Sequence, residues 1–256
     1  MNAMETQQNT PGYRVSVLLD LMDNPELVLY NAVQLTKRMG GTLEVFHVKS
    51  AGQTTADALS EIKTLIAQLQ KHEERIPIGH RLEYGNVKHR IRDYLALVKP
   101  DVLVMGKRRN RMGILGESIT EFVIDQTNAT NIFIFGEGQR LGSFDELHLG
   151  VFGRNLNEKV KHIIMDLKKD NQSAVRLFDI NPQTGETEQP AYPWQRTIPY
   201  VFTQSATALD ALISYVNRTQ TQLLCMPKGP SRTFAFQRNA VREVLHKAKI
   251  PLMILA

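Results

Sequence analysis

The sequence predicts an α/β protein made of two tandem, doubly wound, five-stranded parallel sheets, the second of which is degenerate. Three observations predict this fold class. Short apolar runs alternate with amphipathic stretches of helical spacing, the pattern restarts after a glycine-containing stretch at residues 136–143, and 42% of the 256 residues are hydrophobic. This length suits one large domain or two modest ones, and the apolar content suffices for packed cores.

The first half contains four short, mainly apolar runs, which are typical of parallel strands covered on both faces, and a fifth, more polar run at His80–Tyr84. These runs are Val15–Leu19, Leu43–Val48, His80–Tyr84, Asp101–Gly106 and Ile132–Phe135. Apolar residues at helical spacing predict helices at residues 25–39, 62–69, 87–98 and 119–126. Helices that alternate with strands are the crossovers of a parallel sheet.

The first of these helices carries its own start and stop signals. Asn24 is expected to cap its N-terminus, and Pro25 suits the first helical position. Gly40 and Gly41 are expected to end it, because glycine readily adopts the backbone conformation that closes a helix.

The same order of elements restarts in the second half, which predicts two domains at residues 13–138 and 145–256. Strands are predicted at 147–152, 174–180, 197–203, 223–226 and 252–255, and helices at 157–168, 207–218 and 239–247. Aligning Met105 with Met226 leaves the identical pairs Leu103/Leu224, Met105/Met226, Lys107/Lys228, Arg111/Arg232 and Val123/Val244. Prolines, Gly185 and Trp194 between Asn181 and Pro199 predict an irregular connection in place of the second helix.

Two residues of the first half stand where ligands collect in an open parallel sheet, at strand ends where the winding direction switches. Asp20 follows the first predicted strand, and Gly106 ends the fourth. A carboxylate there can accept hydrogen bonds from ribose or adenine groups, and a glycine-containing loop before a helix can present backbone amides to phosphate. Without a ligand, Asp20 would be a solvent-facing turn residue, and Gly106 would serve the geometry of a turn.

Other kinds of site find little support. The seven histidines show no metal-ligand spacing, and no Gly-x-Ser-x-Gly nucleophile turn occurs. We expect His47 to be packed in its strand, and His89 and His246 to be exposed on helices. Cys225 is expected to be an inert thiol inside an apolar strand. The sequence therefore predicts neither a metal centre nor an enzyme.

The net charge of +5 lies mainly in the second half, where the segment 228–249 is strongly basic. A basic patch can recruit nucleic acid or an acidic partner. Such a pattern is more often a helix face exposed to solvent. The polar first twelve residues and the lack of a long apolar stretch lead us to expect no signal peptide, no membrane span and a cytoplasmic location.

The residues at the strand ends resemble those of the universal stress protein family. The whole chain is similar to the tandem, two-domain members of that family. Asp20 falls where the family has an aspartate after its first strand, and Tyr84-Gly85 resembles the exit of its third strand. Val102–Gly106, followed by Gly116-Glu117-Ser118, resembles the glycine loop and helix start of the family. The resemblance implies a nucleotide-binding-like fold in both halves.

Carried over position by position, the resemblance implies an ATP site in the first domain. The implied contact residues are Asp20 and Val48 at the base and ribose, and Gly106, Gly116 and Ser118 at the phosphates. Arg109 replaces the second glycine of the family's loop, where its guanidinium could bind phosphate itself. The loop is also two residues shorter than the family spacing, and the second domain has lost the matching residues.

These features predict a non-catalytic binding or regulatory protein of the stress response, with weak adenine-nucleotide affinity in the first domain. Two alternatives stay open: an ATP-binding switch with slow hydrolysis, and an adaptor that binds an acidic partner or nucleic acid through residues 228–249. Nucleic acid is the less favoured partner. The apolar strands 132–135 and 252–255 resemble the edges through which the family pairs its domains, so we expect an internal pseudo-dimer; a homodimer and a separate protein partner are also compatible.

Overall fold

The computed structural model describes residues 12–49, 54–72, 76–107, 118–153, 156–181, 192–228 and 240–256. The N-terminal unit consists of β1 (Arg14–Leu18), α1 (Pro25–Met39), β2 (Thr42–Lys49), α2 (Thr55–His72), β3 (Ile78–Tyr84), α3 (Val87–Val98), β4 (Val102–Gly106), α4 (Ile119–Gln126) and β5 (Asn131–Phe135). The C-terminal unit consists of η1 (Phe144–Glu146), β6 (Leu149–Phe152), α5 (Glu158–Lys168), β7 (Val175–Asn181), β8 (Thr197–Thr203), α6 (Ala208–Arg218), β9 (Leu223–Pro227), α7 (Ala240–Lys247) and β10 (Leu252–Leu255).

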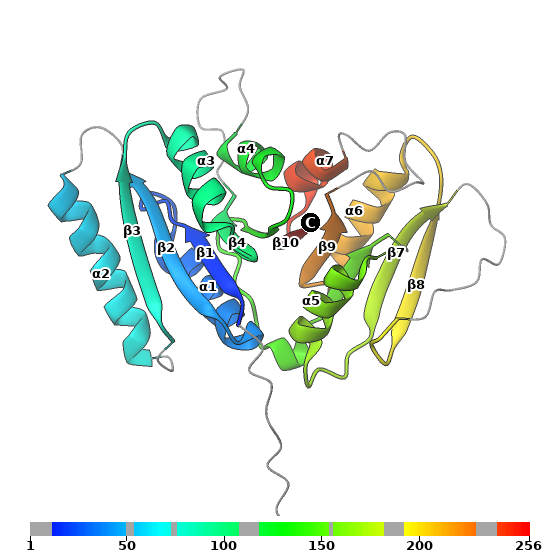
Figure 1. Cartoon of the computed structure of the whole chain (residues 1–256). Coiled ribbons are helices and arrows are strands. Elements are labelled where there is room, and N and C mark those ends of the chain that lie inside the picture. The colour runs from blue at the N-terminus through cyan, green and yellow to red at the C-terminus, as the bar shows by residue number, and fades with distance from the viewer. Residues whose placement is uncertain are drawn as a thin grey trace, which may run out of the picture.

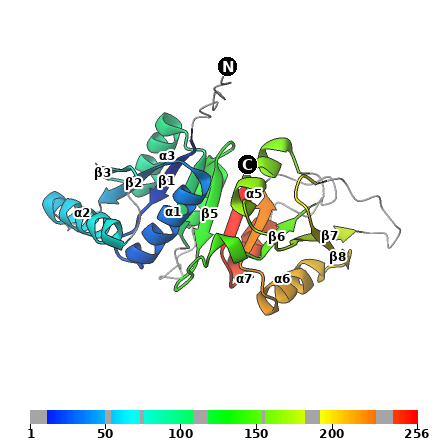
Figure 2. The same ribbon diagram turned by 90° about the horizontal axis from the view of Figure 1, so that it is seen from below.

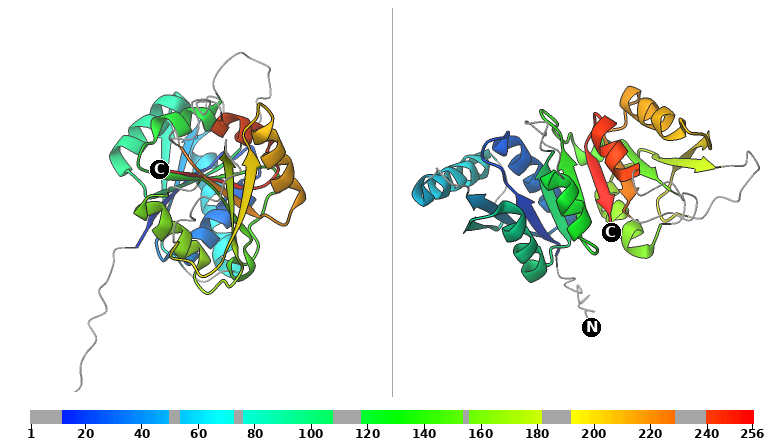
Figure 3. Two further views of the ribbon diagram at one scale, coloured as in Figure 1. Left: turned by 90° about the vertical axis from the view of Figure 1, so that its right-hand side faces the viewer. Right: turned by 90° about the horizontal axis from the view of Figure 1, so that it is seen from above.

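All ten strands form one sheet in the order β3-β2-β1-β4-β5-β10-β9-β6-β7-β8 (Figure 1). Within each unit the neighbouring strands are parallel, and the order in the second unit mirrors the order in the first. β5 and β10 pair antiparallel, with Leu252 opposite Ile134 and Ile254 opposite Ile132, and they lie side by side in the right-hand view of Figure 3. The predicted fold class, two doubly wound five-stranded parallel sheets, is confirmed.

Helices cover both faces of the sheet. α1 and α2 lie on one face and α3 on the other (Figure 2). Because successive side chains of a strand point to opposite faces, each apolar layer runs through both units. One layer contains Val17, Phe133 and Met253, and the other contains Leu103 and Ile254. The hydrophobic core is therefore continuous across the junction of the units.

Gly40 ends α1 and Pro25 begins it as expected, but the Asn24 side chain does not cap the helix. Gly40 ends α1 at φ 67°, and its N–H donates to the Lys37 carbonyl. Asn24 adopts a left-handed conformation (φ 49°) and makes no side-chain cap hydrogen bond, so the predicted Asn24 cap is wrong. The chain turns tightly after β1, with the Asp23 N–H donating to the Asp20 carbonyl. We infer that this turn needs the left-handed backbone that asparagine tolerates, in place of the extended backbone of a capping residue.

The C-terminal unit differs from the first between β7 and β8. In the N-terminal unit α2 fills this place, with Ile62 fully buried. Residues 182–191, within the predicted irregular connection, lie outside the described residues, and residues 192–196 form no helix. Trp194 lies in the same apolar layer as Ile62, and its indole N–H donates to Thr197 Oγ1 at 2.8 Å. A single buried aromatic residue thus contributes to the layer that α2 covers in the first unit.

A buried asparagine fixes the segment that joins the two units. Asn31 on α1 is fully buried; its Nδ2 donates to the Gln139 carbonyl at 2.9 Å, and its Oδ1 accepts from the Leu141 N–H at 3.0 Å. Gln139 in turn donates to the Lys249 carbonyl at 2.7 Å. The joining segment is therefore held to both units by hydrogen bonds to its backbone and side chains.

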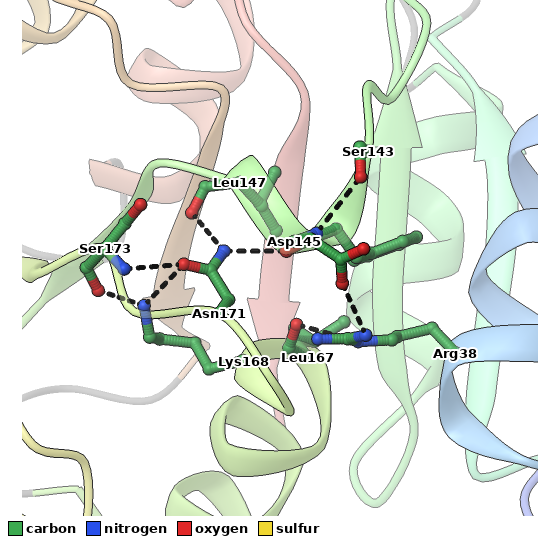
Figure 4. Close-up of polar contacts among 9 residues, drawn as sticks. Arg38, Ser143, Asp145, Leu147, Leu167, Lys168, Asn171 and Ser173 are labelled. Carbon is green, nitrogen blue, oxygen red and sulfur yellow. Dashed lines mark hydrogen bonds and ion pairs between the residues drawn. The ribbon is translucent and has the colours of Figure 1, made fainter.

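A second polar contact lies at the start of the C-terminal unit (Figure 4). Arg38 reaches out from α1, where Nε donates to the Leu167 carbonyl at 3.2 Å and Nη1 lies 3.3 Å from Asp145 Oδ1. Nearby, Asn171 Nδ2 donates to the carbonyls of Phe144 and Leu147. The last turn of α1 is thus joined to both η1 and α5.

On the opposite face, α4 and α7 meet through charged side chains. Ser118 and Glu121 form a capping box at the start of α4. Glu121 Oε1 also lies 3.5 Å from His246 Nε2 and 3.9 Å from Arg242 Nε, and Arg242 Nη2 donates to Asp125 Oδ2 at 2.9 Å. Burial opposes ionisation of Glu121, but the hydrogen bonds from Ser118 and the two neighbouring cations outweigh it and lower the pKa of the carboxyl.

The histidine and cysteine predictions agree with the structure. The side chains of His89 and His246 are 63% and 65% exposed. Cys225 is fully buried, and burial raises the pKa of its thiol far above the ordinary value, which leaves it unreactive. No described helix has the length and apolar character that crossing a membrane requires.

Replacement of Asn31 by leucine tests the anchor of the joining segment. The change leaves the Leu141 N–H and the Gln139 carbonyl without their side-chain partner. We expect the free energy of unfolding, measured by urea denaturation, to fall by about 2–3 kcal/mol, because unsatisfied buried polar groups carry their full desolvation cost. Gln68→Leu on the exposed side of α2 is the control and should change it by less than about 0.5 kcal/mol. Equal effects would show that Asn31 is no anchor.

Replacement of Glu121 by glutamine tests the carboxylate at the start of α4. The folded-state pKa of Glu121 is lowered from 4.5, so its stabilising effect is full above that pH and is lost as the pH falls through the lowered value. The variant should be less stable by about 1 kcal/mol at pH 7, and the difference should shrink below about pH 4.5 in denaturation curves. Glu146→Gln, at an exposed position, should show no such trend. A difference that grows towards acid pH would contradict this role for Glu121.

Candidate functional site

A cavity of about 560 Å³ opens at the carboxyl ends of β1, β2 and β4. β1 lies between β2 and β4 in the sheet, so this is the point at which the winding direction switches. Apolar side chains make most of its wall, with contributions from Leu18, Val28, Phe46, Val48, Val87, Ile91, Met105 and Ile119. Asp20, Val48 and Gly106, three of the predicted site residues, line it together.

Asp20 is held by the tight turn between β1 and α1. Its Oδ1 accepts the Met22 N–H at 3.1 Å, and the residue is half-buried. Asp23 and Asp57 also line the cavity. The described part of the wall therefore carries three carboxylates, whereas its lining residues include no lysine or arginine. This wall suits hydrogen-bond donors better than it suits phosphate groups.

His47 adds a hydrogen-bond acceptor to the same wall. The residue is only 7% exposed, so the prediction of a packed histidine is confirmed. Its Nδ1 lies 2.7 Å from the Leu19 carbonyl. Because a carbonyl only accepts, Nδ1 donates, and in the neutral ring Nε2 is left as an acceptor. Nε2 is buried without a hydrogen-bond partner.

Sequence reasoning missed this role of His47. The only available signal was its position one residue before Val48, at the strand end where ligands collect. Strand patterning shows that a histidine is packed, but it does not show which ring nitrogen lacks a partner.

Gly106 allows a close approach between β4 and α1. A Cβ built at this position would lie 3.3 Å from Val28 Cγ2, which is tighter than an ordinary van der Waals contact. Any larger side chain would enter the cavity or displace α1. Gly106 therefore leaves open a space that a side chain would fill.

Ser118 lies outside this cavity. It lines a neighbouring cavity of about 620 Å³ together with Lys107. Its N–H donates to Glu121 Oε2 at 2.9 Å and its hydroxyl donates to the same oxygen at 3.0 Å, so a carboxylate of the chain already occupies the donors offered to phosphate. Arg109 and Gly116 lie outside the described residues, and the predicted phosphate contacts of all three residues stay predictions.

Strand register shows what the second unit has at the matching positions. Val15 pairs with Val102 as Leu149 pairs with Leu223, so Gly106 corresponds to Pro227. Counting along β1 and β6 from the same register places Arg154, outside the described residues, opposite Asp20 in the repeat. An acidic side chain and a glycine of the first unit are thus replaced by a basic residue and a proline.

No group of three or more histidine, cysteine or acidic side chains among the described residues is arranged to hold a metal ion. The carboxylates of Asp20, Asp23 and Asp57 line one cavity without forming such a group. The cavity is therefore built from separate acceptors on an apolar wall.

Comparison with known proteins places this geometry in a family. The model of the universal stress protein family matches residues 13–130, whereas a search of curated protein sequences found no match. A universal stress protein from Archaeoglobus fulgidus DSM 4304 is similar in structure over 94% of this chain and 96% of its own, with a TM-score of 0.63 and 12% identity. A putative universal stress protein from Pseudomonas aeruginosa UCBPP-PA14 has a TM-score of 0.63 and 9% identity, over 95% and 93% of the two chains.

A universal stress protein solved in complex with cAMP matches only 48% of this chain and 97% of its own, at a TM-score of 0.40 and 15% identity. The structural similarities over the whole chain show a shared fold in both units. Residues 13–130 thus match the universal stress protein family, and a second unit of the same fold follows them in the chain.

Proposed function

We propose that the protein is a non-catalytic regulator that binds an adenine nucleotide in the N-terminal unit. The observation that carries this proposal is the cavity at the switch point, where Asp20, His47 and Gly106 converge. Its volume of about 560 Å³ lies within the range of small-molecule sites, about 300–1,000 Å³.

The polar groups of the wall match a nucleoside. Both the Asp20 carboxylate and the partnerless Nε2 of His47 accept hydrogen bonds. The ribose hydroxyls and the exocyclic amine of adenine donate them. Apolar side chains such as Val48 and Ile91 provide apolar contacts for the base. The residues present therefore fit the nucleoside part of ATP.

The phosphates of a bound nucleotide would point away from the carboxylates that line this cavity. Gly106 ends the cavity, and the next residue, Lys107, lines the neighbouring cavity together with Ser118. An ammonium group on that side favours phosphates directed out of the nucleoside cavity. Since Glu121 already binds the Ser118 amide and hydroxyl, we propose that phosphates contribute little affinity there, so that overall nucleotide binding is weak.

The proposal includes two domains, at residues 13–138 and 145–256, and treats their β5–β10 junction as an internal counterpart of a dimer. We assign nucleotide binding to the first domain alone, because Pro227 stands where the first domain has Gly106. A regulatory role in the stress response, without turnover and in the cytoplasm, completes the proposal.

The adaptor alternative is not favoured by the contacts of the basic segment. Lys228 Nζ donates to the Thr127 carbonyl, Arg242 pairs with Asp125, and Lys247 pairs with Asp210 and Glu243. These three cations, which are partly exposed, make contacts within the chain; Arg232 and Arg238 lie outside the described residues.

Calorimetric titration with ATP–Mg²⁺ tests the proposed site. We expect saturable binding to the wild type, weakened at least tenfold in Asp20→Ala because a charged hydrogen-bond acceptor is lost. Gly106→Val should weaken binding to a similar degree by filling the mouth of the cavity.

Glu26→Ala, at an exposed position on α1 outside the cavity lining, is the matched control and should keep the wild-type affinity. Thermal denaturation should verify that each variant is folded. Absence of saturable binding to the wild type, or full affinity in folded Asp20→Ala, would refute the proposal.

A further inference from the structure

A second cavity, of about 770 Å³, lies where the two units meet. We call it the seam cavity. Its wall is formed by the last turns of α1, by the joining segment and by the chain just after α5; the lining residues are Tyr30, Gln34, Lys37, Arg38, Arg140, Leu141, Gly142, Ser143, Phe144, Asp145, Lys169 and Asp170. It shares no residue with the nucleoside cavity. Both units therefore contribute to a site that neither could form alone.

Two donors on one face of α1 lack partners in this wall. Gln34 Nε2 and Arg38 Nη2 are both buried without a hydrogen-bond partner. The two residues are four positions apart, so they are neighbours on the same side of the helix. A guanidinium has only donors, and no acceptor of the described residues reaches Nη2. Figure 4 shows Arg38 extending from α1 to the polar residues of the C-terminal unit.

Cations outnumber carboxylates around these donors. Lys37, Arg38, Arg140 and Lys169 line the seam cavity, against Asp145 and Asp170. The Arg38 side chain is only 12% exposed, so its charge is poorly screened by solvent, whereas that of Asp145 is 67% exposed. The Arg140 guanidinium lies 4.0 Å from the centre of the Tyr30 ring, which holds it beside α1. The wall therefore attracts an anion.

The ends of α1 and α5 do not account for all these cations. Basic residues often neutralise the free carbonyls of a helix C-terminus. Here the N–H groups of Gly40 and Gly41 already donate to the carbonyls of Lys37 and Thr36, and Arg38 Nε already donates to that of Leu167. The partnerless Nη2 and the side chains of Arg140 and Lys169 are left over after these contacts.

We propose that the seam cavity binds a small polyvalent oxyanion of the phosphate class, held by donors from both units. Gln34 Nε2 and Arg38 Nη2 donate to its oxygens, and Lys37, Arg140 and Lys169 balance its charge. Asp145 competes with it for Arg38, because the Asp145 carboxylate already lies 3.3 Å from Nη1. Since the bound anion contacts both units, its binding stabilises their junction.

Titration with inorganic pyrophosphate at constant ionic strength tests this site. We expect saturable binding to the wild type by calorimetry, and a rise in the thermal denaturation midpoint with pyrophosphate concentration. Arg140→Gln and Lys169→Gln should each weaken binding several-fold, and Gln34→Leu about tenfold. Asp145→Asn should tighten binding several-fold, because it removes the competing carboxylate. Lys63→Gln on the exposed side of α2 removes one positive charge away from the seam and should change nothing.

Further titrations distinguish this site from the proposed nucleotide site and identify the class of anion. Pyrophosphate should bind Asp20→Ala as tightly as it binds the wild type. Orthophosphate should bind in the same cavity, and the dicarboxylate succinate should bind more weakly than pyrophosphate. The proposal is overturned if the wild type shows no saturable binding, if Asp20→Ala weakens it while Arg140→Gln and Lys169→Gln do not, or if Asp145→Asn fails to tighten it. Far-UV circular dichroism should show that each variant is folded.

Discussion

The antiparallel pairing of β5 with β10 is the contact on which the arrangement of the molecule depends. Both strands are almost entirely apolar and buried, and each ends the parallel sheet of its own unit. An unpaired apolar edge exposes both hydrophobic surface and backbone groups that need hydrogen bonds. Pairing inside one chain satisfies both needs and makes two sheets into one. It also brings α1 next to α5 and α4 next to α7, where the polar contacts of the junction form.

The junction differs on the two faces of the sheet. On the α4–α7 face the charges are paired: Glu121 with Arg242 and His246, and Arg242 also with Asp125. On the α1–α5 face Arg38 makes two contacts with the C-terminal unit and keeps one nitrogen without a partner. On the first face the charged groups mostly satisfy one another, whereas the second face retains donors without a partner.

The N-terminal unit combines apolar walls with isolated acceptors at its switch point, and the C-terminal unit has replaced the matching residues. Phe46 and Phe178 occupy equivalent buried positions on β2 and β7, so the repeat keeps its packing residues. Gly106 and Pro227 occupy equivalent positions at the strand ends, but a glycine in one unit is a proline in the other. The two units have thus kept the constraint of a common core and have diverged at the strand ends.

Much of the fold and part of the site follow from the sequence alone. Apolar runs and helical spacing determine where strands and helices lie, because burial of side chains follows a period of two or 3.6 residues. Strand ends in a parallel sheet also predict that Asp20, Val48 and Gly106 come together. The missing side-chain cap at Asn24 shows the limit of local rules, since the tight turn after β1 sets the backbone of this residue.

Only the tertiary structure decided which polar atoms lack hydrogen-bond partners, and which contacts join the two units. The free Nε2 of His47 depends on the Leu19 carbonyl of a neighbouring strand, and the free Nη2 of Arg38 depends on Asp145 and Leu167 in the other unit. These residues are far apart in the chain, so no local pattern encodes their contacts. The sequence by itself determined the elements and the edge of the sheet where the cavity lies, whereas long-range hydrogen bonding decided which polar atoms lack a partner.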